Sequence, residues 1–169
     1  MQVTLQLALK PVWEEIDVLA TKCHDFLKGE GLDADARNAL SMVACELAEN
    51  ATKYGHFNDS KESVKVSLAV QSTHVTVTVA NPVTQKEAES LAILDHTIQW
   101  IRGYQDPFQA YLERLRDVSV QSLMSAESRL GLVRIAYEGQ STLDFFVGAD
   151  GILVVSATFP VQAAGRGEA

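Results

Sequence analysis

Three polar side chains of different chemistry stand at helical spacing in the segment CELAENATKYGHF, residues 45–57. Glu46, Asn50 and Lys53 follow one another at intervals of four and three residues, so on a helix they share one face. A carboxylate can take a proton from a hydroxyl, an amide oxygen can bind a hard cation such as Mg²⁺, and an ammonium offsets phosphate charge. The same spacing fits an ordinary solvated helix face, and the pattern alone leaves both interpretations open.

Apolar periodicity predicts the elements that position these side chains. Alternating apolar residues predict strands over 3–9, 64–70, 75–79, 143–147 and 152–156. Apolar residues at intervals of three and four predict helices over 11–29, 33–55, 85–118 with a break at 103–107, and 130–137. Paired antiparallel strands with helices between them indicate an α+β fold. We expect a two-layer sandwich in which helices cover a mixed, mostly antiparallel sheet.

The first two predicted helices have recognisable ends and apolar stripes. Pro11 suits the first turn of one helix, Asp33 is a candidate N-cap for the next, and Gly55 is its expected stop. The first stripe comprises Trp13, Ile16, Leu19, Cys23, Phe26 and Leu27, and the second comprises Leu40, Val43, Ala44, Leu47 and Ala51. The polar line of Glu46, Asn50 and Lys53 borders the second stripe, which is where a cleft wall would lie.

The segment from Gln85 to Val118 is predicted to be a packed helical block. One apolar stripe runs through Leu91, Leu94, Ile98 and Ile101, and another through Phe108, Leu112 and Leu115. Trp100, Tyr104, Phe108 and Tyr111 lie on the same block, and aromatic side chains bury large areas when packed. We therefore expect most of these aromatics to lie in the core.

Size and charge argue against several classes of protein. The 169 residues suit one domain over residues 1–160, with a disordered tail over 161–169. The net charge of −8 argues against a nucleic-acid partner, and no apolar run is long enough for a membrane span. Cys23 and Cys45 both lie among apolar residues, so we expect them to be reduced and buried. A cytoplasmic location is expected on this basis.

The segment E-L-A-E-N-A-T-K-Y-G, residues 46–55, resembles the N-box of the GHKL superfamily, the Bergerat-fold or histidine kinase-like ATPases. In size and order of elements the chain is most similar to the small anti-sigma-factor serine kinases of that superfamily. The resemblance implies ATP and Mg²⁺ as cofactors. It implies that Glu46 is the catalytic general base, that Asn50 binds Mg²⁺, and that Lys53 approaches the phosphates.

Two further motifs of the family are altered here. Asn81 falls at the position where the aspartate of the family's D-x-G-x-G motif binds adenine. The glycines of that motif are absent here, and Pro82 stiffens the turn that follows Asn81. The segment SRLGLVRIA, residues 128–136, matches the family's second glycine box at Gly131, while Arg129 stands where a glycine is usual. The resemblance assigns Asn81 to adenine, and Arg129 and Gly131 to the phosphates. A strand-ending turn without a ligand and an exposed arginine remain the alternatives.

The helical block 85–118 takes the place of the family's ATP lid, and in this the chain resembles SiaB-like bacterial regulators. That resemblance implies a partner-switching pathway. The partner would be a STAS-domain protein or sigma-factor regulator opposed by a PP2C-type phosphatase, and a homodimer is implied by analogy with anti-sigma kinases. Two functions stay open. One is an ATP-binding regulator acting as a serine/threonine kinase, and the other is a non-catalytic protein-binding regulator that has lost nucleotide binding.

Overall fold

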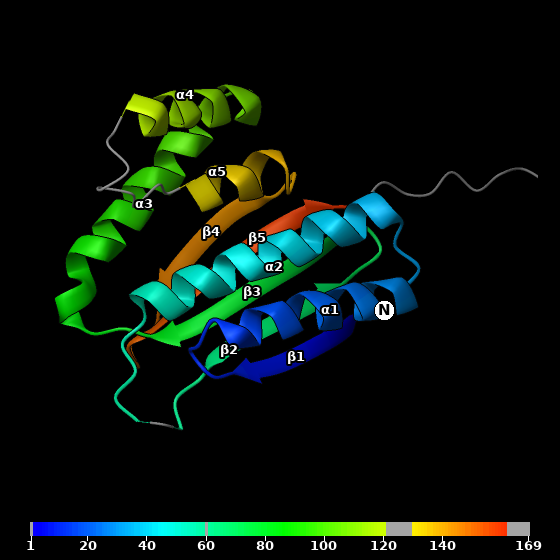
Figure 1. Cartoon of the computed structure of the whole chain (residues 1–169), viewed down its shortest axis with the longest axis horizontal. Helices are drawn as coiled ribbons and strands as arrows, with labels where there is room; N and C mark the ends of the chain where they lie inside the picture. The colour runs from blue at the N-terminus through cyan, green and yellow to red at the C-terminus, as the bar shows by residue number, and fades with distance from the viewer. Residues whose placement is uncertain (1, 60, 121–129, 162–169) are drawn as a thin grey trace, which may run out of the picture.

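The computed structural model describes residues 2–59, 61–120 and 130–161 (Figure 1). In chain order the elements are β1 (Val3–Leu9), α1 (Glu14–Gly29), α2 (Ala34–Tyr54), β2 (Val64–Val70), β3 (His74–Pro82), the 3₁₀ turn η1 (Gln85–Glu87), α3 (Ala88–Arg102), α4 (Pro107–Val120), α5 (Leu130–Tyr137), β4 (Thr142–Val147) and β5 (Ile152–Pro160). The predicted order of strands and helices is confirmed. The expected tail beyond Val161 and the candidate residue Arg129 lie outside the described residues.

The strands form one five-stranded sheet in the order β1-β2-β3-β5-β4. Every pairing within the described part of the chain is antiparallel. One face buries aliphatic residues that lie opposite each other in register, such as Val66 and Val79. On the other face polar residues pair, as where Thr76 faces Thr158. Because a sheet must cover its apolar face, this alternation demands a second layer, and the predicted α+β sandwich is confirmed.

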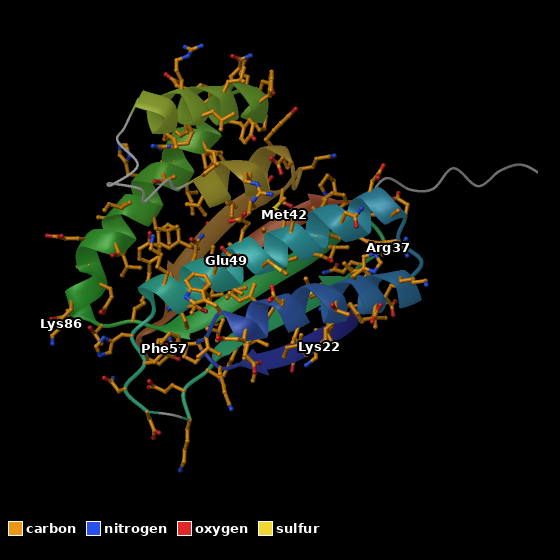
Figure 2. The ribbon with its side chains drawn as sticks, in the orientation of Figure 1. Lys22, Arg37, Met42, Glu49, Phe57 and Lys86 are labelled. Carbon is orange, nitrogen blue, oxygen red and sulfur yellow. The ribbon has the colours of Figure 1, made fainter. Side chains whose placement is uncertain are left out.

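Helices α1 and α2 run side by side across the sheet (Figure 1). They bury the predicted stripes around Leu19 and Leu40 against the strands. Asp33 caps α2 as expected, because its side chain accepts a hydrogen bond of 2.8 Å from the backbone N–H of Ala36. Gly55 ends the helix. A Cβ there would lie 2.6 Å from the ring of Phe57, which sits near the C-terminal end of α2 (Figure 2).

The predicted start of the first helix is wrong by several residues. The chain bends over Pro11 and Val12, and α1 begins only at Glu14. Trp13 therefore does not join the buried stripe, and its side chain is 57% exposed. Helical spacing identifies which residues share a face, but it does not say where the first turn begins when the preceding linker is also apolar.

Helices α3, α4 and α5 gather at one side of the sheet (Figure 1). Ile98 and Ile101 of α3 are buried in the same core as the strands. The expected aromatics are half-buried and pack in small groups, with ring centroids 5.0 Å apart for Trp100 and Tyr104 and 5.2 Å apart for Tyr111 and Tyr137. The block is thus packed, although these rings lie at the edge of the core.

The second predicted stripe of the block is not buried. Leu112 and Leu115 of α4 are 38% and 37% exposed. Helix α4 packs mainly on α5, a short helix of eight residues. Within the described ranges, no helix combines the length and apolar character needed to cross a membrane.

Candidate functional site

A cavity of about 280 Å³ lies between α2, α3 and the sheet. Its floor is formed by strands β3 and β5, with Val79 and Val155 among the lining residues. Helix α2 forms one wall, α3 forms another, and Gly131 and Leu132 of α5 line it as well. The volume is close to the lower end of the range for small-molecule pockets, roughly 300–1,000 Å³. The cavity is therefore large enough to admit a substantial part of a small ligand.

The α2 wall carries the polar line seen in the sequence. Glu46, Asn50 and Lys53 all line the cavity, together with Glu49 one residue before Asn50. The Lys53 ammonium lies 4.9 Å from the centroid of the Tyr54 ring, an attractive cation–π arrangement. Sequence analysis had not singled out Glu49, although it stands three residues after Glu46 and four before Lys53, a spacing that places it on the same helix face.

Glu46 is held by two residues of α5. Arg134 Nη1 donates a hydrogen bond to Glu46 Oε1 and forms an ion pair with it. At Gly131 a Cβ would overlap Glu46 Oε2 in its observed position, so an alanine there would require the carboxylate to shift. The pKa of Glu46 is raised above its usual value, mainly because burial penalises the charged form. Arg134 opposes this shift, and the carboxylates of Glu49 and Glu138 add to it.

Asn81 lies at the floor of the cavity with only 3% of its surface exposed. Its Nδ2 donates a 3.2 Å hydrogen bond to the carbonyl of Pro82, which leaves Oδ1 as the atom that can accept from a ligand. The alternative of a strand-ending turn at Asn81 and Pro82 differs from the structure, since β3 continues through Pro82, opposite Ile152 of β5. Proline is tolerated there because it stands at the last position of the strand.

The α3 wall was not predicted from the sequence. Ser90, Leu94 and Thr97 stand at intervals of four and three residues and all line the cavity. Thr97 is buried, and its hydroxyl donates a 2.7 Å hydrogen bond to the carbonyl of Ile93. The signal that could have found this wall is its spacing, which repeats that of Glu46, Asn50 and Lys53.

His56, in the segment that follows α2, does not line the cavity. Its Nδ1 lies 3.2 Å from Glu87 Oε1, and Glu87 lines the cavity from η1. Hydrogen bonds from the side chain and backbone of Thr84 lower the pKa of Glu87. His56 therefore contacts a residue of the site rather than the cavity itself.

The two cysteines are free thiols, with Cys23 buried and Cys45 half-buried. Burial raises the pKa of Cys23 to about 12 and that of Cys45 to about 11. Both thiols therefore stay protonated at neutral pH, and the nucleophilic thiolate is scarce.

Residues 14–97 match the family model of the histidine kinase-like ATPase domain. The matched range holds α1, α2, β2, β3 and much of α3, and thus most of the cavity walls. In overall structure the chain is similar to a chain of the solved SiaB–SiaC complex from Pseudomonas aeruginosa. The TM-score is 0.69 at 19% identity, covering 92% of this chain and 88% of that one. No curated protein matches the sequence significantly.

Proposed function

Residues 14–97 belong to the histidine kinase-like ATPase domain family, and from this premise we propose that the cavity binds ATP with Mg²⁺. We propose further that the protein is a regulator that phosphorylates a serine or threonine of a protein partner. One observation carries the proposal: Glu46, Asn50 and Lys53 of α2 and Asn81 of β3 line the same cavity. These residues match the family's motif positions and come from elements that only the fold brings together.

The floor of the cavity suits the adenine ring. Val79 and Val155 provide apolar surface for a flat base, and Asn81 Oδ1 can accept a hydrogen bond from the adenine amino group. An amide carries no charge, so this contact would be weaker than one made by an ionised aspartate. The affinity for adenine is therefore expected to depend strongly on the apolar contacts.

The charge of the lining makes a cation necessary for a triphosphate. Among the described lining residues, Glu46, Glu49 and Glu87 carry negative charge and Lys53 is the one lysine. Asn50 would hold Mg²⁺ through its amide oxygen, with phosphate oxygens and water completing the shell, because Mg²⁺ keeps several waters. When bound, Mg²⁺ supplies positive charge that neutralises the phosphates. ATP without a divalent cation is expected to bind poorly.

In the proposed reaction, the hydroxyl oxygen of the partner's serine or threonine forms a bond to the γ-phosphorus of ATP. The bond between that phosphorus and the bridging oxygen breaks, and ADP leaves. Glu46 takes the hydroxyl proton, a role that typically contributes 10²–10⁴-fold to a rate. A STAS-domain protein or sigma-factor regulator is the proposed partner. The likeness to a chain of the two-protein SiaB–SiaC complex supports a protein partner.

Thermal unfolding with and without nucleotide tests the proposal. We expect Mg²⁺-ATP at 100 times its Kd to stabilise the protein by about 2.7 kcal/mol, and ATP with EDTA to give a much smaller shift. Asn50→Ala should remove the Mg²⁺-dependent part. Asn38→Ala, at an exposed position of the same helix, should leave it intact. An Asn50→Ala protein with an undiminished Mg²⁺ effect would contradict the metal assignment.

A protein-binding regulator without nucleotide is the second candidate. It is favoured by the three carboxylates of the lining and by the ion pair that holds Glu46 to Arg134. A folded protein whose melting temperature is unchanged by Mg²⁺-ATP and Mg²⁺-ADP would support this candidate and exclude the first.

A further inference from the structure

A chain of contacts links the cavity wall to α4, of which no described side chain lines the cavity. Arg134 of α5 donates from Nη1 to Glu46 of α2, and from Nε and Nη2 to Glu138 Oε2 at 3.2 Å each. Tyr111 of α4 lies beside this pair: its ring centroid is 5.2 Å from that of Tyr137, the residue before Glu138, and burial together with the Glu138 carboxylate raises the pKa of its hydroxyl. The four residues span three helices, and we refer to them as the α5 relay.

Arg134 binds one oxygen of the Glu46 carboxylate, and Gly131 leaves room for the other. Oε1 is bound by Arg134, and Oε2 lies against Gly131, where a Cβ would overlap it. An unanchored glutamate side chain samples several rotamers. Fixing it in one of them later costs rotamer entropy. Arg134 thus anchors the Glu46 carboxylate at the wall.

Most groups around Glu46 oppose its negative charge. Burial, Glu49 on α2 and Glu138 just after α5 all favour the protonated form. Lys53 lines the same wall seven residues along α2, and Glu87 lines the cavity from η1. Arg134 is the positive group in direct contact with the carboxylate. A general base must be ionised before it accepts a proton. Arg134 therefore counteracts the burial and the neighbouring carboxylates, which favour the protonated form of Glu46.

We propose that Arg134 is the positioning residue of Glu46, holding its carboxylate ionised and in one orientation, and that Glu138 and Tyr111 extend this control to α4. The proposal rests on the proposed function, in which Glu46 is the base. It makes the helical block 85–118 part of the arrangement around the base, although no described side chain of α4 lines the cavity.

Titration of the Glu46 side-chain carboxyl by NMR of ¹³C-glutamate-labelled protein tests the proposal, with the signal assigned by its loss in Glu46→Gln. Arg134→Gln should raise the pKa of Glu46 by about 1–3 units, because an opposite charge in contact is lost. Arg134→Lys should keep most of the wild-type value. Glu138→Gln should lower it, because a like charge is removed and Arg134 is freed for Glu46.

The two variants, Arg134→Gln and Glu138→Gln, should shift the pKa of Glu46 in opposite directions. This separates an effect of the relay from loss of structure, because unfolding would bring the Glu46 pKa of both variants to the same ordinary value. A wild-type pKa in folded Arg134→Gln would overturn the proposal. If that variant does not fold, a pKa that fails to fall in Glu138→Gln overturns it equally.

The α4 end of the relay has its own matched pair of variants. Tyr111→Phe removes the hydroxyl that lies beside Glu138. Glu138 then competes more strongly for Arg134, so the pKa of Glu46 should rise. Tyr104→Phe removes a hydroxyl that donates to Glu113, outside the relay, and should change nothing. Equal Glu46 pKa values in Tyr111→Phe and Tyr104→Phe would overturn the extension of the relay to α4. No nucleotide is used, so an absent ATP-induced thermal shift counts against the proposed function, and an unchanged Glu46 pKa counts against Arg134.

Discussion

Two glycines of the α5 region face α2 and allow the two helices to approach closely. Gly131 lies against the Glu46 carboxylate, and a Cβ at Gly139 would come within 2.5 Å of both Val43 Cγ2 and the Ile135 carbonyl oxygen. The family resemblance assigned Gly131 to the phosphates. The observed contact gives a different reason for glycine there, because the candidate base itself occupies the space of a side chain.

We expect Gly139→Ala to destabilise the protein by about 1–3 kcal/mol, because its new methyl group meets a buried valine and backbone that cannot move freely. Gly131→Ala should cost less, since it meets the movable tip of Glu46, but it should displace that carboxylate from Arg134. Urea unfolding measures both.

The control for these variants is Gly29→Ala at the end of α1, where no atom lies within 4 Å of the new Cβ. It should be neutral or stabilise by up to about 1 kcal/mol through helix propensity. A Gly139→Ala protein as stable as Gly29→Ala would contradict the close approach of α5 to α2.

At the scale of elements, η1 connects the end of β3 to α3 and fixes the cavity mouth. Thr84 and Glu87 form a capping box, in which Glu87 Oε2 accepts a 2.7 Å hydrogen bond from the Thr84 backbone N–H. Glu87 Oε1 contacts His56 in the segment that follows α2. The start of α3 is therefore tied to the end of α2, the two helices that form facing walls.

This arrangement predicts a pH dependence. Because the folded pKa of Glu87 is lowered, its contribution to stability is fully present above the unfolded value of about 4.3, and it is lost as pH falls through the folded value. The melting-temperature difference between wild type and Glu87→Gln should thus be largest near neutral pH and vanish toward pH 3. Glu89→Gln, an exposed change on α3, is the control. A difference that grows on acidification would contradict the contacts at η1.

At the scale of the whole molecule, the helical insertion shares the core of the sheet. Ile98 is almost fully buried and belongs to the same hydrophobic cluster as the central strands. A segment that shares its buried surface with the rest of a small domain is expected to unfold with it in one transition.

We expect Ile98→Ala to destabilise the protein by about 2–5 kcal/mol, and Ile93→Ala, 38% exposed on the same helix, to cost much less. Far-UV circular dichroism and the fluorescence of Trp100, observed in a Trp13→Phe background, should give coincident urea transitions for each variant. An earlier fluorescence transition would mean that the insertion unfolds separately and would contradict a single domain.

The sequence by itself determined the elements, their order and most of their ends. The Asp33 cap, the Gly55 stop and the buried stripe of α2 depend on residues a few positions apart, so local patterns carry them. It also identified the polar line from Glu46 to Lys53, because spacing on one helix decides which side chains share a face.

The tertiary structure alone decided what faces that line. Arg134 lies 88 residues from Glu46 in the chain, and Thr97 belongs to a helix whose position the sequence does not specify. Trp13 was misjudged, and the role of Gly131 was taken from a motif rather than from its neighbour. Such contacts are set by how α2, α3 and α5 pack around a shared core, which is a property of the whole chain and leaves no local pattern.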